Sequence, residues 1–207
     1  MATHKTENSD SAEAARELIL NAAYARFAKY GYNKTTMAEI AGDCKMSAAN
    51  LYRFFASKAD IAAGIAVNIF AAKETEWRAL VRKPEISAAK RLEELVLWDF
   101  RHTYETFSNR PAITELVGFI SNERQDLLRR HKETNRALLA EVLAEGNRSG
   151  EFDVADILAS AELVQAAASF YFFRIVQMQM SCDDTPEGLE QLTLGVVQLL
   201  IRGLAKR

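Results

Sequence analysis

The sequence predicts an all-α protein of about nine helices. Only three prolines and nine glycines occur in 207 residues, which leaves long uninterrupted spans. Apolar residues recur along these spans at intervals of about three and four residues, the spacing of one helix face. Runs that alternate strictly between apolar and polar residues, as strands would, are missing. We therefore expect helices throughout the chain and no sheet.

The first expected helix spans Ser11 to Tyr30. It follows a polar segment, residues 1–10, which we expect to be a disordered tail. Apolar side chains recur at helical spacing along the span. Gly31 directly after it can adopt the left-handed conformation that ends many helices.

A helix-turn-helix pattern follows. Thr36, with Glu39 three residues later, matches a capping box, so a helix of about two turns begins there. Residues 42–46 form the turn, and Ser47 caps the next helix. Cys44, inside the turn, is expected to be a small apolar filler and not a redox sensor.

The third helix has two different faces. Leu51, Phe54 and Phe55 form an apolar face that would pack on the first two helices. Small residues in the first turn of the other face, Ala48 and Ala49, would let the backbone approach the floor of a DNA groove. The helix is therefore a candidate recognition helix.

Polar side chains beside these alanines can bind DNA. Asn50 can pair with adenine through two hydrogen bonds, and Arg53 can reach a guanine or a phosphate. Ser57 and Asp60 cap a fourth helix, and Lys58 in its first turn can hold a phosphate together with the helix N-terminus. On spacing alone, a three-helix piece of a larger bundle with solvated charges fits equally well.

The charge distribution favours a DNA-binding N-terminal region on an acidic remainder. Residues 1–58 hold eight Lys/Arg and six Asp/Glu, whereas the rest hold eighteen and twenty-two, so the local balances are +2 and −4. A local basic surface attracts phosphate.

Other features of the sequence indicate where in the cell the protein is expected. The longest uncharged run, Ile61 to Ala72, has twelve residues and is too short to cross a bilayer. The polar N-terminus lacks an apolar signal core, and Cys44 and Cys182 match no disulfide or metal pattern. We therefore expect a cytoplasmic protein without membrane contact.

Six further helices are expected after the first three. Prolines, glycines and polar runs separate them. Their predicted spans are 57–82, 87–108, 112–122, 126–147, 154–180 and 187–205.

The last two helices are apolar around most of their circumference. Such a helix has to be buried on both sides, and in a small protein a partner subunit is the simplest cover. A single compact core in a monomer is the alternative. The expected interface residues are Leu158, Val164, Leu192, Val196 and Leu199.

Aromatic and methionine side chains gather in two places and suggest a pocket for a small apolar or amphipathic effector. Polar residues among them need partners that a ligand can supply, although plain core packing explains the same pattern. Asp99 and His102 lie three residues apart, but two ligands do not make a metal site. The candidate pocket residues are Trp98, His102, Phe119, Tyr171, Arg174 and Met178.

A series of short motifs in the N-terminal region resembles the signature of a known family. In chain order the motifs are Gly31-Tyr32, Thr35-Thr36, Ile40-Ala41, Met46-Ser47, Leu51-Tyr52-Arg53-Phe54-Phe55 and Ser57-Lys58. Their order, their spacing and the trailing lysine resemble the tetracycline-repressor (TetR) family of bacterial transcriptional regulators. The match covers about the first sixty residues, and the remaining chain agrees only in length and helical character.

The resemblance implies roles for single residues. Phosphate contacts would come from Thr36, Tyr52 and Lys58, and base contacts would come from Met37, Ala48, Ala49 and Asn50. The family usually has glycine at the turn position that is Lys45 here, so either the backbone avoids positive φ or Lys45 tolerates it at a cost. Lys45 would also add a phosphate contact.

The resemblance further implies a DNA-binding regulator that dimerises through its last two helices. A homodimer would bind a palindromic operator in double-stranded DNA, with half-sites roughly 34 Å apart, and an effector would release it. We expect a DNA-binding domain at 1–57 and an effector-binding and dimerisation domain at 58–207. Repression is the expected outcome, although sequence does not reveal the sign of regulation.

Two other classes of function compete with this interpretation. A small all-helical enzyme lacks support, because the sequence holds no glycine-rich phosphate loop, nucleophile elbow, HExxH motif or Cys/His cluster. We therefore expect neither a cofactor nor a metal. A helical adaptor without a DNA role is disfavoured by the basic N-terminal region.

Overall fold

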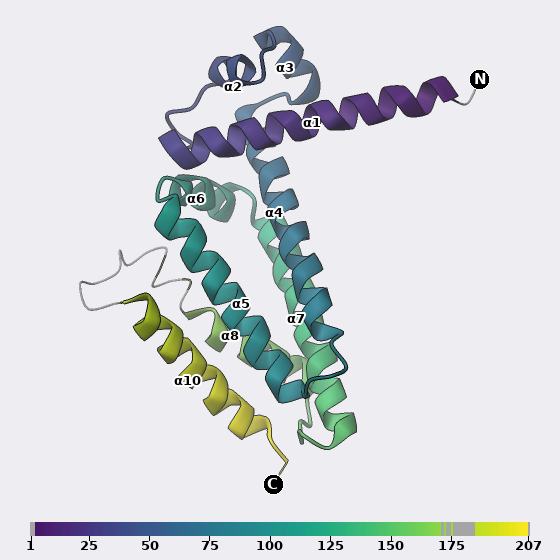
Figure 1. Ribbon diagram of the computed structural model, residues 1–207, viewed down its shortest axis with the longest axis vertical. Coiled ribbons are helices and arrows are strands. Elements are labelled where there is room, and N and C mark those ends of the chain that lie inside the picture. Colours follow the sequence, from purple (N-terminus) through teal and green to yellow (C-terminus); the bar gives the residue numbers. More distant parts are fainter. Residues whose placement is uncertain (1–2, 171, 173–174, 176–184, 207) are drawn as a thin grey trace. The chain divides into compact units, whose positions relative to one another are not determined.

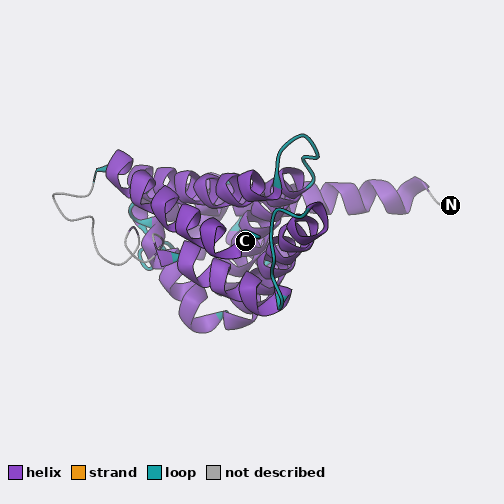
Figure 2. Cartoon of the chain, turned by 90° about the horizontal axis from the view of Figure 1, so that it is seen from below, coloured by secondary structure: helices purple, strands orange, loops and turns teal. Residues whose placement is uncertain are grey.

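The described residues fold into α-helices. The computed structural model describes residues 3–170, 172, 175 and 185–206. The helices in this part of the chain are α1 (Thr3–Tyr30), α2 (Met37–Asp43), α3 (Ala48–Phe54), α4 (Lys58–Val81), α5 (Ala88–Asn109), α6 (Ile113–Glu123), α7 (Gln125–Ser149), α8 (Ile157–Ala168) and α10 (Pro186–Leu204) (Figure 1). The same residues contain no strand, and a single isolated bridge joins Phe152 to Ala205 (Figure 2). The predicted all-α fold is confirmed.

The chain divides into two compact units. The first, which we call the head, comprises Met1–Phe70 and Arg110–Leu128, and the second, the body, comprises Ala71–Asn109 and Arg129–Arg207. The helix α6 therefore packs within the head, although it lies far from α1 to α3 in the sequence. The functional division expected at 57/58 is a separate prediction that this packing does not test.

Apolar stripes on the first helices build the core of the head. Ile19 and Phe27 of α1, Ile40 of α2 and Leu51 of α3 are all fully buried. Phe55 is buried directly after α3, and Phe54 is half-buried, so the predicted apolar face of α3 is present. This core leaves the opposite side of α3 accessible.

The body is a bundle in which α10 lies along α5 (Figure 1). Its larger cluster joins the end of α4 to α5, α7 and α8. A second cluster joins Val96 and Phe100 of α5 to Leu189 and Val197 of α10. Both clusters bury side chains at helical spacing, as the sequence pattern predicts.

A short segment between α7 and α8 ties the ends of several body helices together. The carboxylate of Glu151 accepts the N–H groups of Ala88 and Ala89, at 3.0 and 3.2 Å, and so caps α5. The N–H of Asp153 donates to the carbonyl of Leu204 at 3.0 Å. Five of the predicted helices, those matching α4, α5, α6, α7 and α10, agree with the structure to within two residues at each end.

Three helix ends differ from prediction by more than two residues, namely the start of α1 and both ends of α8, which begins at Ile157 and not at 154. Helix α1 begins at Thr3, where the sequence predicted a disordered tail. Residues 3–10 contain no proline or glycine, and extending an existing helix costs less free energy than starting a new one. The predicted helix 154–180 is interrupted, because α8 ends in a turn at Ser169. The Ser169 hydroxyl and N–H both donate to the Gln165 carbonyl, at 2.7 and 3.1 Å. No proline or glycine marks this end in the sequence, so apolar spacing alone predicted a longer helix.

Among the described residues, no single helix is long and apolar enough to cross a membrane. Only α3 and α4 taken together, with a bend of 52° between them, meet the length and composition requirement.

Candidate functional site

The helix-turn-helix begins with a complete capping box. The hydroxyl oxygen of Thr36 accepts the Glu39 N–H at 3.3 Å, and the Glu39 carboxylate accepts the Thr36 N–H at 2.8 Å. Hydrogen bonds from the backbone and the hydroxyl of Thr36 lower the pKa of Glu39, although the carboxylate is exposed. The predicted cap is confirmed, and it fixes the start of α2.

The turn between α2 and α3 contains a strained residue. Lys45 has φ +54°, the one positive φ outside glycine among the described residues. The backbone therefore does not avoid positive φ here. Lys45 adopts the left-handed conformation at a steric cost, as the second of the two predicted alternatives states. Its side chain is exposed, whereas Cys44 is buried, and burial raises the pKa of the Cys44 thiol. A protonated, buried thiol is poorly reactive, as expected for a filler.

Helix α3 exposes the side that was predicted to meet DNA. The Ser47 hydroxyl oxygen accepts the Asn50 N–H at 3.2 Å, so the predicted cap of α3 is confirmed. Ala49 and Tyr52 are exposed. Four other candidate residues are accessible to different degrees: Arg53 is exposed, whereas Met37, Ala48 and Asn50 are half-buried. The candidate base-contacting residues thus lie at the accessible first turns of α2 and α3.

An arginine that the sequence analysis missed holds the far end of α3. Arg16 of α1 donates from Nη1 to the carbonyl of Phe54 at 2.7 Å, and its guanidinium lies 4.3 Å from the ring centre of Phe55. The contact anchors the last residue of α3 to α1. No local motif signals it, because the two residues are 38 positions apart.

Exposed cations outnumber acidic charges on this surface. Arg26 makes two hydrogen bonds to the Asp43 carboxylate, at 2.6 and 2.9 Å, and contacts Glu39 at 3.3 Å. These are the two acidic residues of the stretch 26–58, and the Arg26 guanidinium holds the pKa of Asp43 below its usual range. The exposed cations of that stretch are Lys29, Lys34, Lys45 and Arg53. Arg26 balances one of the two carboxylates, so these four exposed cations outnumber the one remaining acidic charge of the stretch.

Lys58 points inward in the structure. Its ammonium donates to the carbonyls of Tyr32 and Thr35, at 2.7 and 2.8 Å, and lies 4.3 Å from the ring centre of Tyr32. Burial lowers the pKa of Lys58, and Glu115 and Glu39 oppose that effect. The phosphate contact predicted for Lys58 requires its ammonium to leave these carbonyls or to be shared with them. The cap predicted just before it is confirmed, since the Ser57 hydroxyl oxygen accepts the Asp60 N–H at 3.1 Å.

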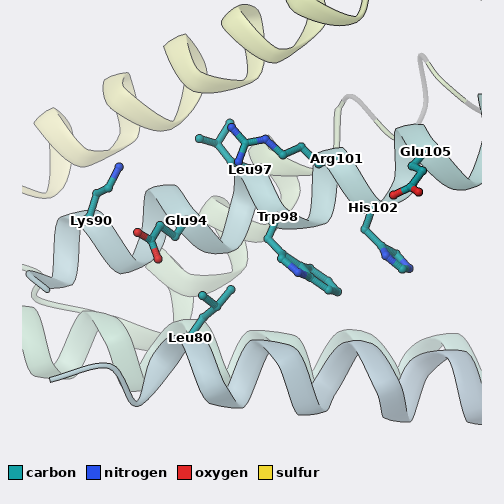
Figure 3. A pocket seen from close by; sticks show the side chains of 8 residues that line it. All are labelled: Leu80, Lys90, Glu94, Leu97, Trp98, Arg101, His102 and Glu105. Carbon is teal, nitrogen blue, oxygen red and sulfur yellow. The ribbon is translucent and has the colours of Figure 1, made fainter. Parts of the chain in front are cut away.

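The body has a cavity of about 400 Å³ that two of the candidate pocket residues line (Figure 3). Trp98 and His102 extend from α5 on the same side, and their rings lie parallel with centres 5.0 Å apart. Burial and the Lys73 ammonium lower the pKa of His102, so its imidazole is neutral at pH 7. The lining residues are Leu80, Lys90, Glu94, Leu97, Trp98, Arg101, His102 and Glu105.

The remaining pocket predictions have different outcomes. Phe119 belongs to α6 in the head, where it stacks on Tyr32 with ring centres 4.6 Å apart, and it does not line the cavity. Its assignment to an effector pocket stays a prediction, and sequence clustering alone could not tell that α6 joins the head. Tyr171, Arg174 and Met178 lie outside the described residues. Asp99 pairs with Lys73 at 2.5 Å, and no group of three or more potential metal ligands occurs in the described ranges.

The candidate dimer face is partly exposed apolar surface on α8 and α10, which contact each other. Leu158 and Leu199 are each 67% exposed, and Leu192 is also exposed. Val196 is half-buried. Val164 is only 3% exposed and packs in the core of its own body, so its assignment to an interface is wrong. Its neighbour Leu163, at 68% exposure, lies on the accessible side of α8 and was missed.

Comparisons with known families give two matches. Residues 19–65 match the model described as bacterial regulatory proteins, tetR family, and residues 88–191 match a tetracyclin repressor-like C-terminal domain. A search of curated proteins found no match.

Solved structures share the fold at low sequence identity. A transcriptional regulator from Cytophaga hutchinsonii superposes with a TM-score of 0.74 at 23% identity, over 92% of this chain and 98% of its own. A putative TetR-family regulator from Mesorhizobium loti gives 0.75 at 16% identity, over 94% and 98%. SmeT, the repressor of the Stenotrophomonas maltophilia multidrug efflux pump SmeDEF, gives 0.70 at 15% identity, over 92% and 90%.

Proposed function

Because this chain belongs to the TetR family of bacterial transcriptional regulators, we propose that it is a homodimeric repressor that a small effector releases from a palindromic operator. Its general role, a DNA-binding transcriptional regulator and not an enzyme, follows from the family. The cytoplasm, where the chromosome lies, is its proposed location. The operator, the dimer and the effector are proposals, and a separate structural feature supports each of them.

The observation that carries the operator proposal is the accessible first turn of α3, where Ala49 is exposed, beside the exposed cations Lys45 and Arg53. Ala48, Ala49 and Asn50 would reach base edges, with Met37 of α2 beside them. The proposed phosphate contacts are Thr36, Lys45, Tyr52, Arg53 and Lys58. Positive charge supplies most of the affinity, and the first turn of α3 supplies the sequence preference.

Exposed leucines on α8 and α10 support a dimer. Large apolar side chains that are two-thirds exposed on two contacting helices indicate a surface that a partner covers. A symmetric dimer would set two α3 helices in successive major grooves, roughly 34 Å apart.

The cavity beside α5 supports a small amphipathic effector. Trp98 and Leu80 offer apolar surface, and His102 offers a neutral polar ring at the same opening. An effector releases the operator only if it binds more tightly to a dimer whose heads are spaced wrongly.

Selection of bound fragments from random DNA by the full-length protein tests the proposal. We expect a palindromic consensus. Asn50→Ala should relax the sequence preference. Arg53→Ala should weaken binding to all DNA sequences and reduce the slope of log affinity against log salt concentration by about 1. Arg78→Ala, an exposed arginine of the body, is the matched control and should change neither. A set of bound fragments without any palindrome, or an Asn50 variant with unchanged preference, would contradict the assignment.

A further inference from the structure

The loop that joins α1 to α2, residues 31–36, is held by side chains from α4 and α6. The loop has no helix or strand of its own, so its backbone groups need other partners. Lys58 of α4 binds its carbonyls, at 2.7 Å for Tyr32 and 2.8 Å for Thr35. Glu115 of α6 accepts the N–H of Asn33 at 2.8 Å. The Lys58 ammonium thus binds carbonyl groups of the loop, and the Glu115 carboxylate binds one of its N–H groups.

The approach of Glu115 to the loop is unusually close. A Cβ added at Gly31 would lie 2.7 Å from both carboxylate oxygens of Glu115, and Gly31 has φ +89°. Only glycine therefore satisfies both the backbone conformation and the space that the carboxylate occupies. One turn along α6, Phe119 stacks on Tyr32 of the same loop. The helix α6 thus contacts three consecutive loop residues, 31–33.

The loop leads directly into the DNA-binding surface. It ends at Thr36, the N-cap of α2, and Met37 follows; both are candidate DNA contacts. The buried hydroxyl of Thr35 closes the loop on itself by donating to the Gly31 carbonyl at 2.8 Å. Displacement of residues 31–33 would therefore move the start of α2.

We propose that Glu115 is a positioning residue for DNA binding, which holds the α1–α2 loop together with Lys58 and so orients Thr36 and the start of α2 toward the operator. The inference rests on the proposed use of this surface to bind an operator. It assigns a DNA-binding role to an acidic residue outside the segment that matches the family's N-terminal model, residues 19–65.

Whether removal of the Glu115 carboxylate weakens or tightens DNA binding distinguishes a positioning role from a simple repulsion of phosphate. If Glu115 were only an acid near phosphate, its removal would tighten DNA binding, because a repulsive charge is lost. If it positions the loop, Glu115→Ala should weaken binding of the full-length protein to its selected operator about 5- to 10-fold. Glu115→Gln should stay within about twofold of the wild type, because its amide oxygen still accepts the Asn33 N–H. Tighter binding by both variants, or unchanged binding by Glu115→Ala, would overturn the proposal.

Two further measurements keep the test decisive. The amide proton of Asn33 should exchange faster with solvent in Glu115→Ala than in the wild type or Glu115→Gln, as followed by NMR. This readout does not require DNA, so a wild type that binds no operator would count against the proposed function and not against the contact. Glu123→Ala, an exposed acid at the end of the same helix, is the charge-matched control. If Glu115→Ala does not fold, Glu115→Asp, which is shorter by one methylene, should show the same loss of operator affinity.

Discussion

At the scale of single residues, the helix-turn-helix combines a strained backbone with a useful charge. Lys45 occupies a left-handed conformation that glycine would adopt without steric cost. Its exposed ammonium lies in the turn just before α3, where a phosphate contact is predicted. Stability and DNA affinity therefore place opposite demands on this position.

Substitutions at Lys45 should separate these two demands. Lys45→Gly should raise the free energy of unfolding by about 1 kcal/mol because the strain is relieved, and it should weaken DNA binding because a cation is lost. Lys45→Ala is the matched control, since it removes the same charge but keeps a Cβ at positive φ. Urea denaturation and binding titrations at several salt concentrations measure the two effects. Equal stability of the Gly and Ala variants would exclude strain as the cause.

Residue contacts also show what a sequence can predict about such a site. The caps at Thr36 and Ser47 were predictable, because each hydroxyl binds an N–H three residues away. The contacts of Arg16 and Glu115 were not, because their partners lie 38 and 82 positions away and no local pattern encodes them. Local chemistry thus identified the candidate recognition helix, and the long-range contacts that hold it had to come from the structure.

At the scale of elements, most helices follow from local signals, and their exceptions have identifiable causes. Side-chain caps mark the starts of α4, α5 and α10, and prolines follow the ends of α4 and α5. No proline or glycine marks the end of α8 at Ser169, so apolar periodicity alone predicted a longer helix. The start of α5 has a local cap, because the Ser87 hydroxyl oxygen accepts the Lys90 N–H at 3.1 Å, and Glu151 from a distant loop adds a second cap that the sequence does not reveal.

The cap of α5 by Glu151 should make the stability of the body depend on pH. Burial raises the pKa of Glu151, but hydrogen bonds from Ala88, Ala89 and nearby serine hydroxyls outweigh it, and the pKa falls below 4.5. A carboxyl group whose pKa is lower in the folded state stabilises the fold above pH 4.5, and this contribution is lost as the pH falls through the folded-state value.

Glu151→Gln should therefore unfold more easily than the wild type at pH 7, by about 1 kcal/mol. The difference should shrink as the pH is lowered from 4.5 through the folded-state pKa of Glu151, and it should vanish once the carboxylate is protonated in the folded protein as well. Thermal unfolding followed by circular dichroism at several pH values measures it. Glu133→Gln, an exposed glutamate of α7, is the control. A constant difference at all pH values would show that the cap does not act through its charge.

At the scale of the whole molecule, the exposed leucines of α8 and α10 predict the assembly state. Leu199→Glu should disrupt the proposed dimer, because it places a charge on a surface that a partner would bury. Sedimentation should then show a monomer, and operator affinity should fall at least about tenfold because one half-site no longer supports the other. Val67→Glu, an exposed apolar position of the head, is the control. A monomeric wild type would contradict the dimer directly.

The distribution of aromatic side chains between the two units has a practical consequence. Both tryptophans of the chain, Trp77 and Trp98, lie in the body, one in its core and the other at the cavity. The head therefore carries no tryptophan, and selectively excited tryptophan emission is an intrinsic optical label of the body alone. Candidate effectors can be screened by this emission without any added dye, because one of the two tryptophans lines the cavity. A change in that emission when operator DNA is added would measure communication from head to body in the unmodified protein.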